Sequence, residues 1–268
     1  MRESLPVLFR DDCVVAVHKP SGLLVHRSMI DRHETRFALQ IVRDQVGQRV
    51  YPVHRLDKGT SGVLLFAFDR ESAKRMGASF DAGLVNKRYL AIVRGWIPES
   101  GTIDHPLRRH DDLYGASVSP SGVEHDFLQR YGADVSASES LFAVTHYRRL
   151  ACAEIAERVE PGQGFPTSRY SFVELMPVTG RQHQLRRHLK HVSHPIIGDA
   201  TYGKGAHNRF IAARFGVGRL LLACTAMTFP HPQDGQSVAV EAAVSGDFQV
   251  VLAGFGWTSF QKDKAPTT

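Results

Sequence analysis

The residues best suited to catalysis form one run, His54-Arg55-Leu56-Asp57-Lys58-Gly59-Thr60-Ser61-Gly62, which lies between two apolar segments. Asp57 stands between Arg55 and Lys58, and a nearby cation favours the ionised form of a carboxyl group. The two glycines and two hydroxyls that follow allow a tight turn whose backbone can approach a ligand. Asp57 therefore has the properties of a nucleophile, or of a base that stays deprotonated. A surface turn with an ordinary ion pair is the alternative, and composition alone does not decide between them.

A second run, Thr179–His188, places three arginines among polar residues. On a helix, Arg181 and Leu185 lie four apart on one face, whereas Arg186 and Arg187 point elsewhere. A basic helix can lie along a phosphate backbone with one arginine turned inward to pair with a carboxylate. The alternative is a solvated cationic helix, which is the more common outcome for such a pattern.

The third run, Lys87–Gly95, alternates as a strand does. Alternation places Tyr89, Ala91 and Val93 on one face of that strand. An aromatic ring beside cations suits stacking on a base and contact with its phosphate. A tyrosine in a half-buried strand is more often part of the core, so this signal is weak on its own.

Two further patterns are rejected. Residues 198–205 nearly match a phosphate-binding P-loop, but Gly205 stands where the Ser or Thr that holds magnesium is required. Four histidines lie close together in the sequence, at His183, His188, His191 and His194. The last three share a face only if a helix continues toward Pro195, and neither HExxH nor an intervening acid is present. We therefore predict no metal site, and no cofactor motif is present.

The elements that must position these residues follow from hydrophobic periodicity and turn signals. Strands are predicted at 14–18, 50–53, 63–68, 88–94, 142–150, 170–175 and 220–229. Helices are predicted over 34–46, from Asp69 or Ser72 to Ala82, over 182–191 and over 247–253. Several strands follow one another directly, which indicates an α+β fold with a largely antiparallel sheet.

A single domain over residues 1–260 is the simplest organisation. Residues 98–141 are rich in Ser, Gly, Asp and Pro without a sustained period, and we predict a long surface connection there. Residues 261–268 are predicted to form a disordered tail.

The formal net charge of +6 is local. Residues 180–214 hold seven basic side chains and one acid, whereas the other 233 residues carry 26 of each sign. A basic coat over the whole domain is excluded, and a focused cationic docking surface is predicted. On this interpretation Arg186→Ala or Lys190→Ala weakens binding of an anionic partner and leaves the fold intact.

Composition narrows the class of protein further. No apolar run reaches the roughly 20 residues that a membrane helix needs, and the N-terminus lacks a secretory signal pattern. The three cysteines show no CxxC spacing, and an odd number fits a reducing compartment. We therefore predict a cytoplasmic enzyme with no membrane association.

Taken together, the motifs resemble those of the RluA family of pseudouridine synthases. HRLDKGTSG is similar to its HRLDxxTSG catalytic loop, 87–95 to its KxYxAxVxG strand, and 179–186 to its TGRxHQxR segment. Residues 19–22 resemble its KPxG motif, and 197–203 its IxGDxxYG motif. The match covers roughly residues 7–232 in the order of the family. It implies an α+β catalytic fold with a mixed, mainly antiparallel central sheet, helices flanking it and an active-site cleft across it.

The resemblance implies that a uridine within RNA is isomerised to pseudouridine without a cofactor or metal. If the matching positions have the roles they have in that family, Asp57 is the nucleophile, Arg181 pairs with it, and Tyr89 stacks on the uracil. Arg55 takes the place of the flipped uridine, and phosphate contacts offset the cost of flipping. The other residues expected at the RNA are His54, Lys58, Thr60, Lys87, Leu185, Arg186, Arg187 and Lys190.

Within the family the resemblance favours tRNA, with uridine 65 in the T-stem as the target. The same reaction on ribosomal RNA or at another tRNA position is the alternative, and a non-catalytic RNA-binding or RNA-folding protein is a distant one. The expected partner is tRNA alone, bound by a monomer without an S4-like domain or an obligate protein partner. One departure is noted: Ala223 and Cys224 stand where such proteins usually have histidine and alanine.

Overall fold

The structure is a computed structural model, and it describes residues 3–26, 33–108, 140–162, 164–244 and 246–257. Its strands are β1 (Val7–Arg10), β2 (Val14–Lys19), β3 (Tyr51–Pro52), β4 (Ser61–Ala67), β5 (Asn86–Arg94), β6 (Ser100–Asp104), β7 (Leu107–Arg108), β8 (Ser140–Leu141), β9 (Val144–Ile155), β10 (Ser168–Pro177), β11 (Leu222–Pro230) and β12 (Ser237–Glu241). Its helices are α1 (Ala38–Val46), α2 (Arg70–Asp81), α4 (Gln184–His191), α5 (Gly205–Phe215) and α6 (Gly246–Gly254).

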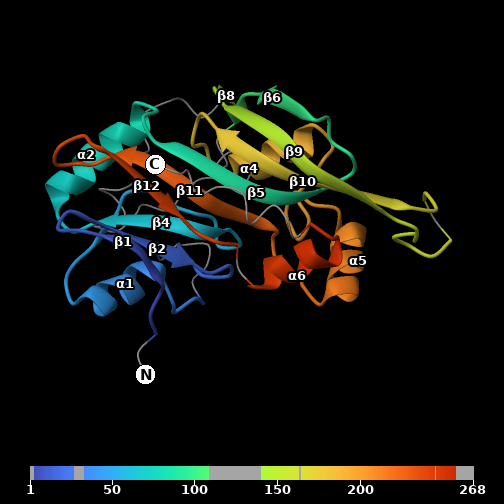
Figure 1. Ribbon diagram of the computed structural model, residues 1–268, viewed down its shortest axis with the longest axis horizontal. Coiled ribbons are helices and arrows are strands. Elements are labelled where there is room, and N and C mark those ends of the chain that lie inside the picture. The colour runs from blue at the N-terminus through green and yellow to red at the C-terminus, as the bar shows by residue number, and fades with distance from the viewer. Residues whose placement is uncertain (1–2, 27–32, 109–139, 163, 245, 258–268) are drawn as a thin grey trace.

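One sheet organises the molecule (Figure 1). Its order is β1-β2-β4-β11-β5-β10-β9-β6, with β12 beside β11 and β3 beside β4. The β4–β11 pair is parallel, and every other neighbouring pair in this sheet is antiparallel. The mixed, mainly antiparallel sheet with helices on it confirms the predicted fold class. β4 and β11 come from opposite ends of the chain, so their pairing joins the two halves at the centre of the sheet.

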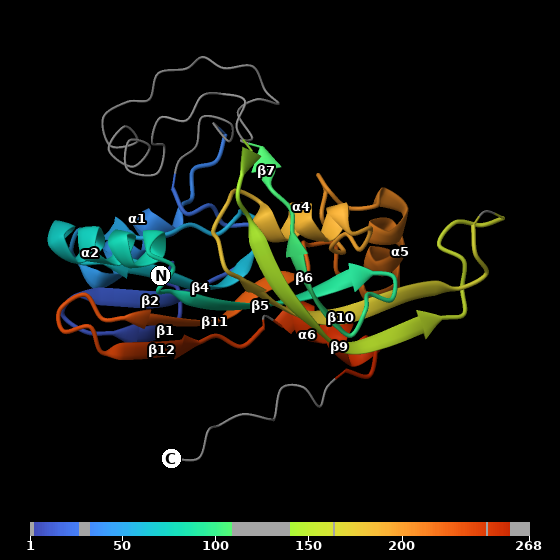
Figure 2. The ribbon, with the colours of Figure 1, turned by 90° about the horizontal axis from the view of Figure 1, so that it is seen from above.

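The core divides into three apolar clusters. The first lies among β1–β4, α1 and α2, and the second among β5, β10, α5 and α6. In the third, Leu185 and Leu189 of α4 lie with Ala91 and Val93 of β5. Figure 2 shows α1, α2 and α4 on one side of the sheet and α6 on the other. Burial of the apolar face of α4 fixes the rotation of this basic helix above the sheet.

Each predicted strand and helix is present, with its ends moved by a few residues. Of the two predicted N-caps of α2, the structure selects Asp69, whose side chain accepts a hydrogen bond from the Ser72 amide (2.8 Å). Gly47 ends α1 in the left-handed conformation, as its type predicts. Of the described helices, none is both long and apolar enough to cross a membrane.

The prediction of a connection without regular structure at 98–141 is wrong at its ends. Ser100–Asp104 pairs with β9 at the edge of the sheet, and Leu107–Arg108 pairs with Ser140–Leu141. These short segments have no sustained alternation, so only the neighbouring strand reveals them. Residues 109–139 and the tail predicted at 261–268 lie outside the described residues. Strands β1 and β12 and helix α5 were not predicted either.

Gly62 makes the central strand pairing possible, and its substitution tests this. Its φ is +111°, and a Cβ there would lie 1.9 Å from the Cys224 carbonyl oxygen. We expect Gly62→Ala to lower the free energy of unfolding by about 3 kcal/mol or more, because the two strands must separate. Gly47→Ala is the control, because Gly47 also has a positive φ (+74°) but nothing lies within 4 Å of its added Cβ. Urea unfolding would contradict this account if both variants lost the same stability.

Candidate active site

Asp57 lies in the loop that joins β3 to β4, and its backbone is held tightly. Its carbonyl accepts the Thr60 amide (3.0 Å), which closes the turn predicted from the glycines and hydroxyls. The Lys58 carbonyl accepts the Gly22 amide (2.8 Å), and the Ser21 hydroxyl donates to the Gly59 carbonyl (2.7 Å). The loop is therefore bound to the segment that follows β2, and the carboxylate is presented from a fixed backbone.

Lys19 reinforces this junction from inside. Its side chain is fully buried, and Nζ donates to the carbonyls of Pro20 (3.0 Å), Leu23 (2.6 Å) and Lys58 (3.2 Å). Burial lowers the pKa of Lys19 to about 7, whereas the charge of Asp57 favours the ammonium form. Three carbonyl acceptors match the three donors of an ammonium group. Lys19 thus ties the loop of Asp57 to the end of β2.

Arg186 is the arginine that meets Asp57. Its Nη1 lies 3.0 Å from Asp57 Oδ2, while Nε and Nη2 bind Asp199 Oδ2 (2.7 Å) and Oδ1 (2.9 Å). Its side chain is 11% exposed and that of Asp199 is fully buried. Although burial opposes the charge, the bonds to Asp199 and the nearness of Asp57 raise the pKa of Arg186. Arg186 is therefore a permanent cation that holds one oxygen of Asp57.

Asp199 in turn is fixed by backbone donors. Its Oδ1 accepts the amides of Thr201 and Tyr202, both at 2.9 Å. Burial raises the pKa of this carboxyl, but the bonds from Arg186 and from these amides outweigh burial and lower it overall. The ion pair of Arg186 is consequently built on a rigid turn, and the arginine fork cannot rotate away from Asp57 without losing two charged bonds.

The predicted pairing of Arg181 with Asp57 is wrong. The Nε of Arg181 donates to the Phe142 carbonyl (3.1 Å), and its side chain is exposed. The helix begins at Gln184 and not at 182, so Arg181 precedes it and its helical relation to Leu185 does not hold. The Gln184 side chain accepts the Arg181 amide (3.0 Å). Arg181 thus belongs to the turn that starts α4, and the inward arginine is Arg186.

Tyr89 lies on β5, near Asp57, and its ring is part of the apolar cluster that contains Leu185. Burial raises the pKa of the Tyr89 phenol well above its usual value, and hydrogen bonding with Cys224 and the charge of Asp57 act in the same direction. The phenol is therefore protonated at any physiological pH. Cys224, noted above as a departure from the family, is buried and contacts this hydroxyl.

Three residues of the predicted RNA-binding set have contacts within the protein. The His54 ring stacks on Phe80 with centroids 5.2 Å apart, and its Nε2 accepts the Leu65 amide (3.0 Å). Lys58 pairs with Glu34 (2.7 Å), and Thr60 is buried. Arg55 is exposed, which is compatible with its predicted role in the RNA complex.

The pH dependence of stability tests the role of His54. Burial lowers the pKa of its imidazole to about 3 from 6.5, so the unfolded chain takes up a proton in acid that the folded chain does not. The free energy of unfolding therefore falls as the pH falls from 6.5 toward 3. His54→Gln keeps an acceptor for the Leu65 amide but does not titrate. We expect this variant to lose about 1 kcal/mol less per pH unit across that window, measured by urea unfolding.

The control for that experiment is His146→Gln, which removes an exposed histidine on β9. Other buried histidines contribute equally to all three proteins, so only the difference is interpreted. Parallel curves for His54→Gln and the wild type would show that the folded chain admits the proton.

The cationic segment is only partly available as a docking surface. Arg186 is committed to two carboxylates, and Arg209 and Arg214 pair with Glu160 (3.5 Å) and Glu157 (2.6 Å) of the β9–β10 hairpin. The charge count over residues 180–214 did not include these two glutamates, because they lie outside that range in the sequence. Because Arg186 is bound to two carboxylates, we now expect Arg186→Ala to destabilise the fold as well as to weaken binding.

The remaining predicted RNA-binding cations lie beside the site or on α4. The Lys87 ammonium lies 5.8 Å from the centroid of Phe80, and burial lowers its pKa. The Arg187 Nη1 donates to the Arg108 carbonyl (2.9 Å), and exposed Lys190 lies 5.6 Å from the centroid of Tyr202. Lys190 is therefore an exposed cation on α4, and its contact with RNA stays a prediction.

His183, one of the four histidines that lie close together in the sequence, reaches Asp57. Its backbone is left-handed, with φ 52° and ψ 24°, and its Nε2 lies 3.8 Å from Asp57 Oδ1. Its Nδ1 lies 3.1 Å from the Tyr202 hydroxyl. Asp199 and Tyr202 belong to the motif at residues 197–203, which by itself assigns them no contact near Asp57. Sequence spacing gives no sign that these side chains meet at Asp57.

The clustered histidines do not share a metal site. His188 is buried and lies 3.0 Å from both the Thr145 hydroxyl and the His105 carbonyl, whereas the His191 ring stacks on the ring of His105. His194 lies beyond the end of α4 and contacts the Arg94 carbonyl (2.9 Å).

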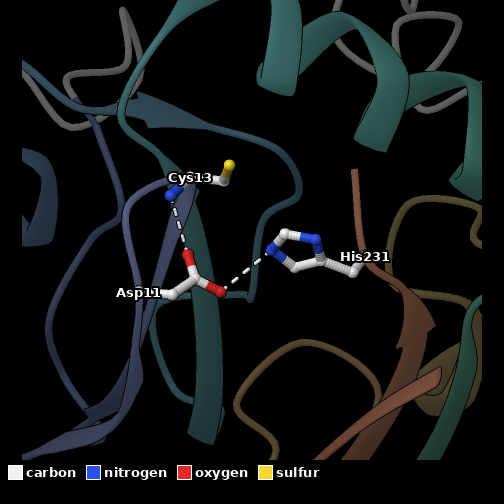
Figure 3. Close-up of side chains that lie close together, drawn as sticks. All are labelled: Asp11, Cys13 and His231. Carbon is white, nitrogen blue, oxygen red and sulfur yellow. Dashed lines mark hydrogen bonds and ion pairs between the residues drawn. The ribbon is translucent and has the colours of Figure 1, made fainter. Parts of the chain in front are cut away.

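Another group of potential metal ligands, Asp11, Cys13 and His231, lies where the β1–β2 turn meets the end of β11 (Figure 3). Asp11 Oδ1 accepts the amides of Cys13 (2.7 Å) and Val14 (2.8 Å), while Oδ2 lies 2.9 Å from His231 Nε2. The His231 ring also lies near Asp234 (3.3 Å). These contacts join the β1–β2 turn to the turn that follows β11, which is a structural role.

The predicted cleft stays a prediction. Described residues line two surface hollows, one beside Glu3 and Arg36 and the other beside Glu157 and Arg214, and neither lining includes Asp57. Asp57 is a half-buried carboxylate with one oxygen bound by Arg186 and the other 3.8 Å from His183 Nε2. Such a carboxylate can act as a nucleophile or accept a proton.

Comparison with known proteins agrees with this arrangement. The family model described as RNA pseudouridylate synthase matches residues 13–191, which include the loop of Asp57 and helix α4. The chain is 42% identical to tRNA pseudouridine synthase C of Vibrio cholerae over 253 residues, which are 94% of this chain and 96% of that protein. It is 44% identical to the protein of the same name from Haemophilus ducreyi, with the same coverage.

Among solved structures, the human RNA pseudouridylate synthase domain containing 4 is similar in fold. Its TM-score is 0.65 at 23% identity, over 94% of this chain and 93% of that chain. These matches confirm the relationship first indicated by the spacing of the motifs. The sequence, the sheet and the loop of Asp57 together place the chain in the RNA pseudouridylate synthase family.

Proposed function

We propose that the protein converts uridine to pseudouridine in tRNA, with uridine 65 of the T-stem as its target and Asp57 as the nucleophile. The observation that carries this proposal is the geometry of the Asp57 carboxylate. Arg186 binds Oδ2 at 3.0 Å, whereas His183 Nε2 lies 3.8 Å from Oδ1. One oxygen is thereby oriented by a cation, and the other is left to react.

The side chains around Asp57 suit a flipped pyrimidine. Tyr89 offers an aromatic ring beside the carboxylate, and aromatic rings stack on bases that have left the helix. Arg55 is exposed on the loop of Asp57, where it could occupy the space that the uridine vacates. Lys190 on the outer face of α4 and Arg181 at its N-terminal turn are exposed cations for the phosphate backbone.

The choice of tRNA rests on the relatives. Both bacterial proteins described above have tRNA pseudouridine synthase C as their name and align over nearly their whole length. The particular uridine rests on the resemblance of the motifs. Ribosomal RNA and other tRNA positions are the competing substrates.

Nucleotide-resolution mapping of pseudouridine tests the substrate. Purified protein is incubated with a tRNA transcript that carries uridine at position 65, with a matched transcript that carries cytidine there, and with ribosomal RNA. We expect one new pseudouridine, at position 65, and no product in the matched transcript. Product at another tRNA position or only in ribosomal RNA would replace the proposed target, and no product in any RNA would remove the proposed reaction.

A further inference from the structure

The side chain of His183 has a place in the site that the roles assigned so far leave unused. Its Nε2 lies 3.8 Å from Asp57 Oδ1, whereas Arg186 binds the other oxygen, Oδ2. The exposed fraction of its side chain is 19%, the same as that of Asp57, so both groups are open to solvent to the same extent. A distance of 3.8 Å is too long for a hydrogen bond, so the ring is not locked onto the carboxylate.

The backbone of His183 is held in an unusual conformation. Its φ of 52° is left-handed, and Ser193 is the other non-glycine residue with positive φ within the described ranges. Gln184 maintains the conformation, because its side chain accepts the Arg181 amide (3.0 Å) and donates to the Val144 carbonyl (3.0 Å). A non-glycine residue held left-handed beside a reactive group is a signature of functional sites.

The ring of His183 is oriented from its other nitrogen. Nδ1 lies 3.1 Å from the Tyr202 hydroxyl, and the two rings meet edge to face with centroids 5.7 Å apart. Burial raises the pKa of Tyr202, so its hydroxyl stays protonated and can accept the Nδ1 proton. In that tautomer Nε2 carries a lone pair and faces Asp57.

The reaction needs a proton acceptor other than the nucleophile. When uridine becomes pseudouridine, the bond from C1′ to N1 breaks, a bond from C1′ to C5 forms, C5 loses a proton and N1 gains one. In this step Oδ1 of Asp57 forms a bond to C6 of the uracil, and that bond breaks when the C5 proton leaves and the C5–C6 double bond is restored. Until then Oδ1 cannot take the proton, and Oδ2 is bound to Arg186. The Tyr89 phenol is kept protonated by burial and is a poor base. His183, whose Nε2 lies 3.8 Å from Oδ1, is the other side chain described above at the carboxylate that has an atom able to accept a proton.

We propose that His183 is a catalytic residue that accepts the C5 proton after the new carbon–carbon bond has formed. The proton on Nε2 of His183 then passes to solvent, and N1 of the uracil takes a proton from solvent. The imidazole therefore returns to its starting protonation state. The charged and titratable groups around the imidazole are Asp57, Arg186, Tyr202 and, against the Tyr202 ring, Lys190. This inference rests on the proposed isomerisation and deepens it.

The test compares two substrates that differ only at C5. On tRNA with ordinary uridine, we expect His183→Asn to convert the target about 10²- to 10⁴-fold more slowly than the wild type, as loss of a general base does. On tRNA with 5-fluorouridine no proton can leave C5, so the rearrangement to the carbon-linked fluorinated adduct should run within about threefold of the wild-type rate. Asparagine tolerates the left-handed backbone, so the variant should fold.

Two further arms separate proton transfer from structural damage. His183→Gly also fits the backbone, and added imidazole should restore its conversion of uridine. The wild-type single-turnover rate should fall in acid as His183 becomes protonated, and this acid limb should be missing in His183→Asn. His146→Asn, which removes an exposed histidine on β9, is the control and should convert both substrates at the wild-type rate.

The outcomes are distinct. If His183→Asn converts uridine within twofold of the wild type, the histidine takes no proton and the inference is wrong. If it loses both substrates equally and imidazole restores nothing, His183 only positions Asp57 and the inference is again wrong. If the wild type itself makes no pseudouridine, the proposed function fails, whatever the variants do.

Discussion

Arg186→Met is expected to abolish activity and to destabilise the fold together. The methionine keeps much of the aliphatic volume but leaves Asp199 buried and unpaired, and it removes the cation from Asp57. Removal of one partner from a buried ion pair costs about 3–5 kcal/mol, so the free energy of unfolding should fall by that order. Loss of the oriented cation should lower the single-turnover rate by about 10³-fold.

Two further variants separate these effects. Arg181→Met removes an exposed arginine from the neighbouring turn, and we expect it to keep the stability and to lower only affinity for RNA. Arg186→Met combined with Asp199→Asn removes the unpaired buried charge, so it should regain part of the lost stability without regaining activity. If Arg181→Met instead lost activity to the same extent as Arg186→Met, the arginine that serves Asp57 would be misassigned.

Asp57→Asn is expected to remove pseudouridine formation and to leave the protein folded. Asparagine has the shape of aspartate but cannot act as a nucleophile or base, so the rate should fall by about 10⁴-fold or more. Asp199 still holds the Arg186 fork in this variant, so the free energy of unfolding should change by only about 1 kcal/mol. Pseudouridine mapping and urea unfolding of the same sample measure both quantities.

The contrast between the two variants is itself informative. Asp57→Asn separates activity from stability, whereas Arg186→Met couples them. Retention of the wild-type rate by Asp57→Asn would remove the nucleophile assignment, because the protein would then make pseudouridine with another group. Equal destabilisation by both variants would show that Asp57, and not Asp199, is the principal anchor of Arg186.

Local sequence determined most of the elements and marked Asp57 as the candidate nucleophile. The strands at 63–68 and 88–94 are predictable because a buried or half-buried strand leaves its own apolar run or alternation. Asp69 and Gly47 mark helix ends through their own chemistry. Asp57 is recognisable because its flanking cations and the following glycines lie within a few residues of it. Each of these signals is short in range.

Tertiary structure alone decided which partners Asp57 has. Whether Arg181 or Arg186 turns toward Asp57 depends on where α4 begins and on which face of α4 packs on β5. Because α4 begins at Gln184, two residues later than predicted, Arg186 and not Arg181 binds Asp57. Asp199 and Tyr202 reach the site through a turn whose position no local pattern encodes. The apparent docking charge was likewise reduced by acids on the distant β9–β10 hairpin. Ion pairs depend on distance in space, whereas composition and spacing report only distance along the chain.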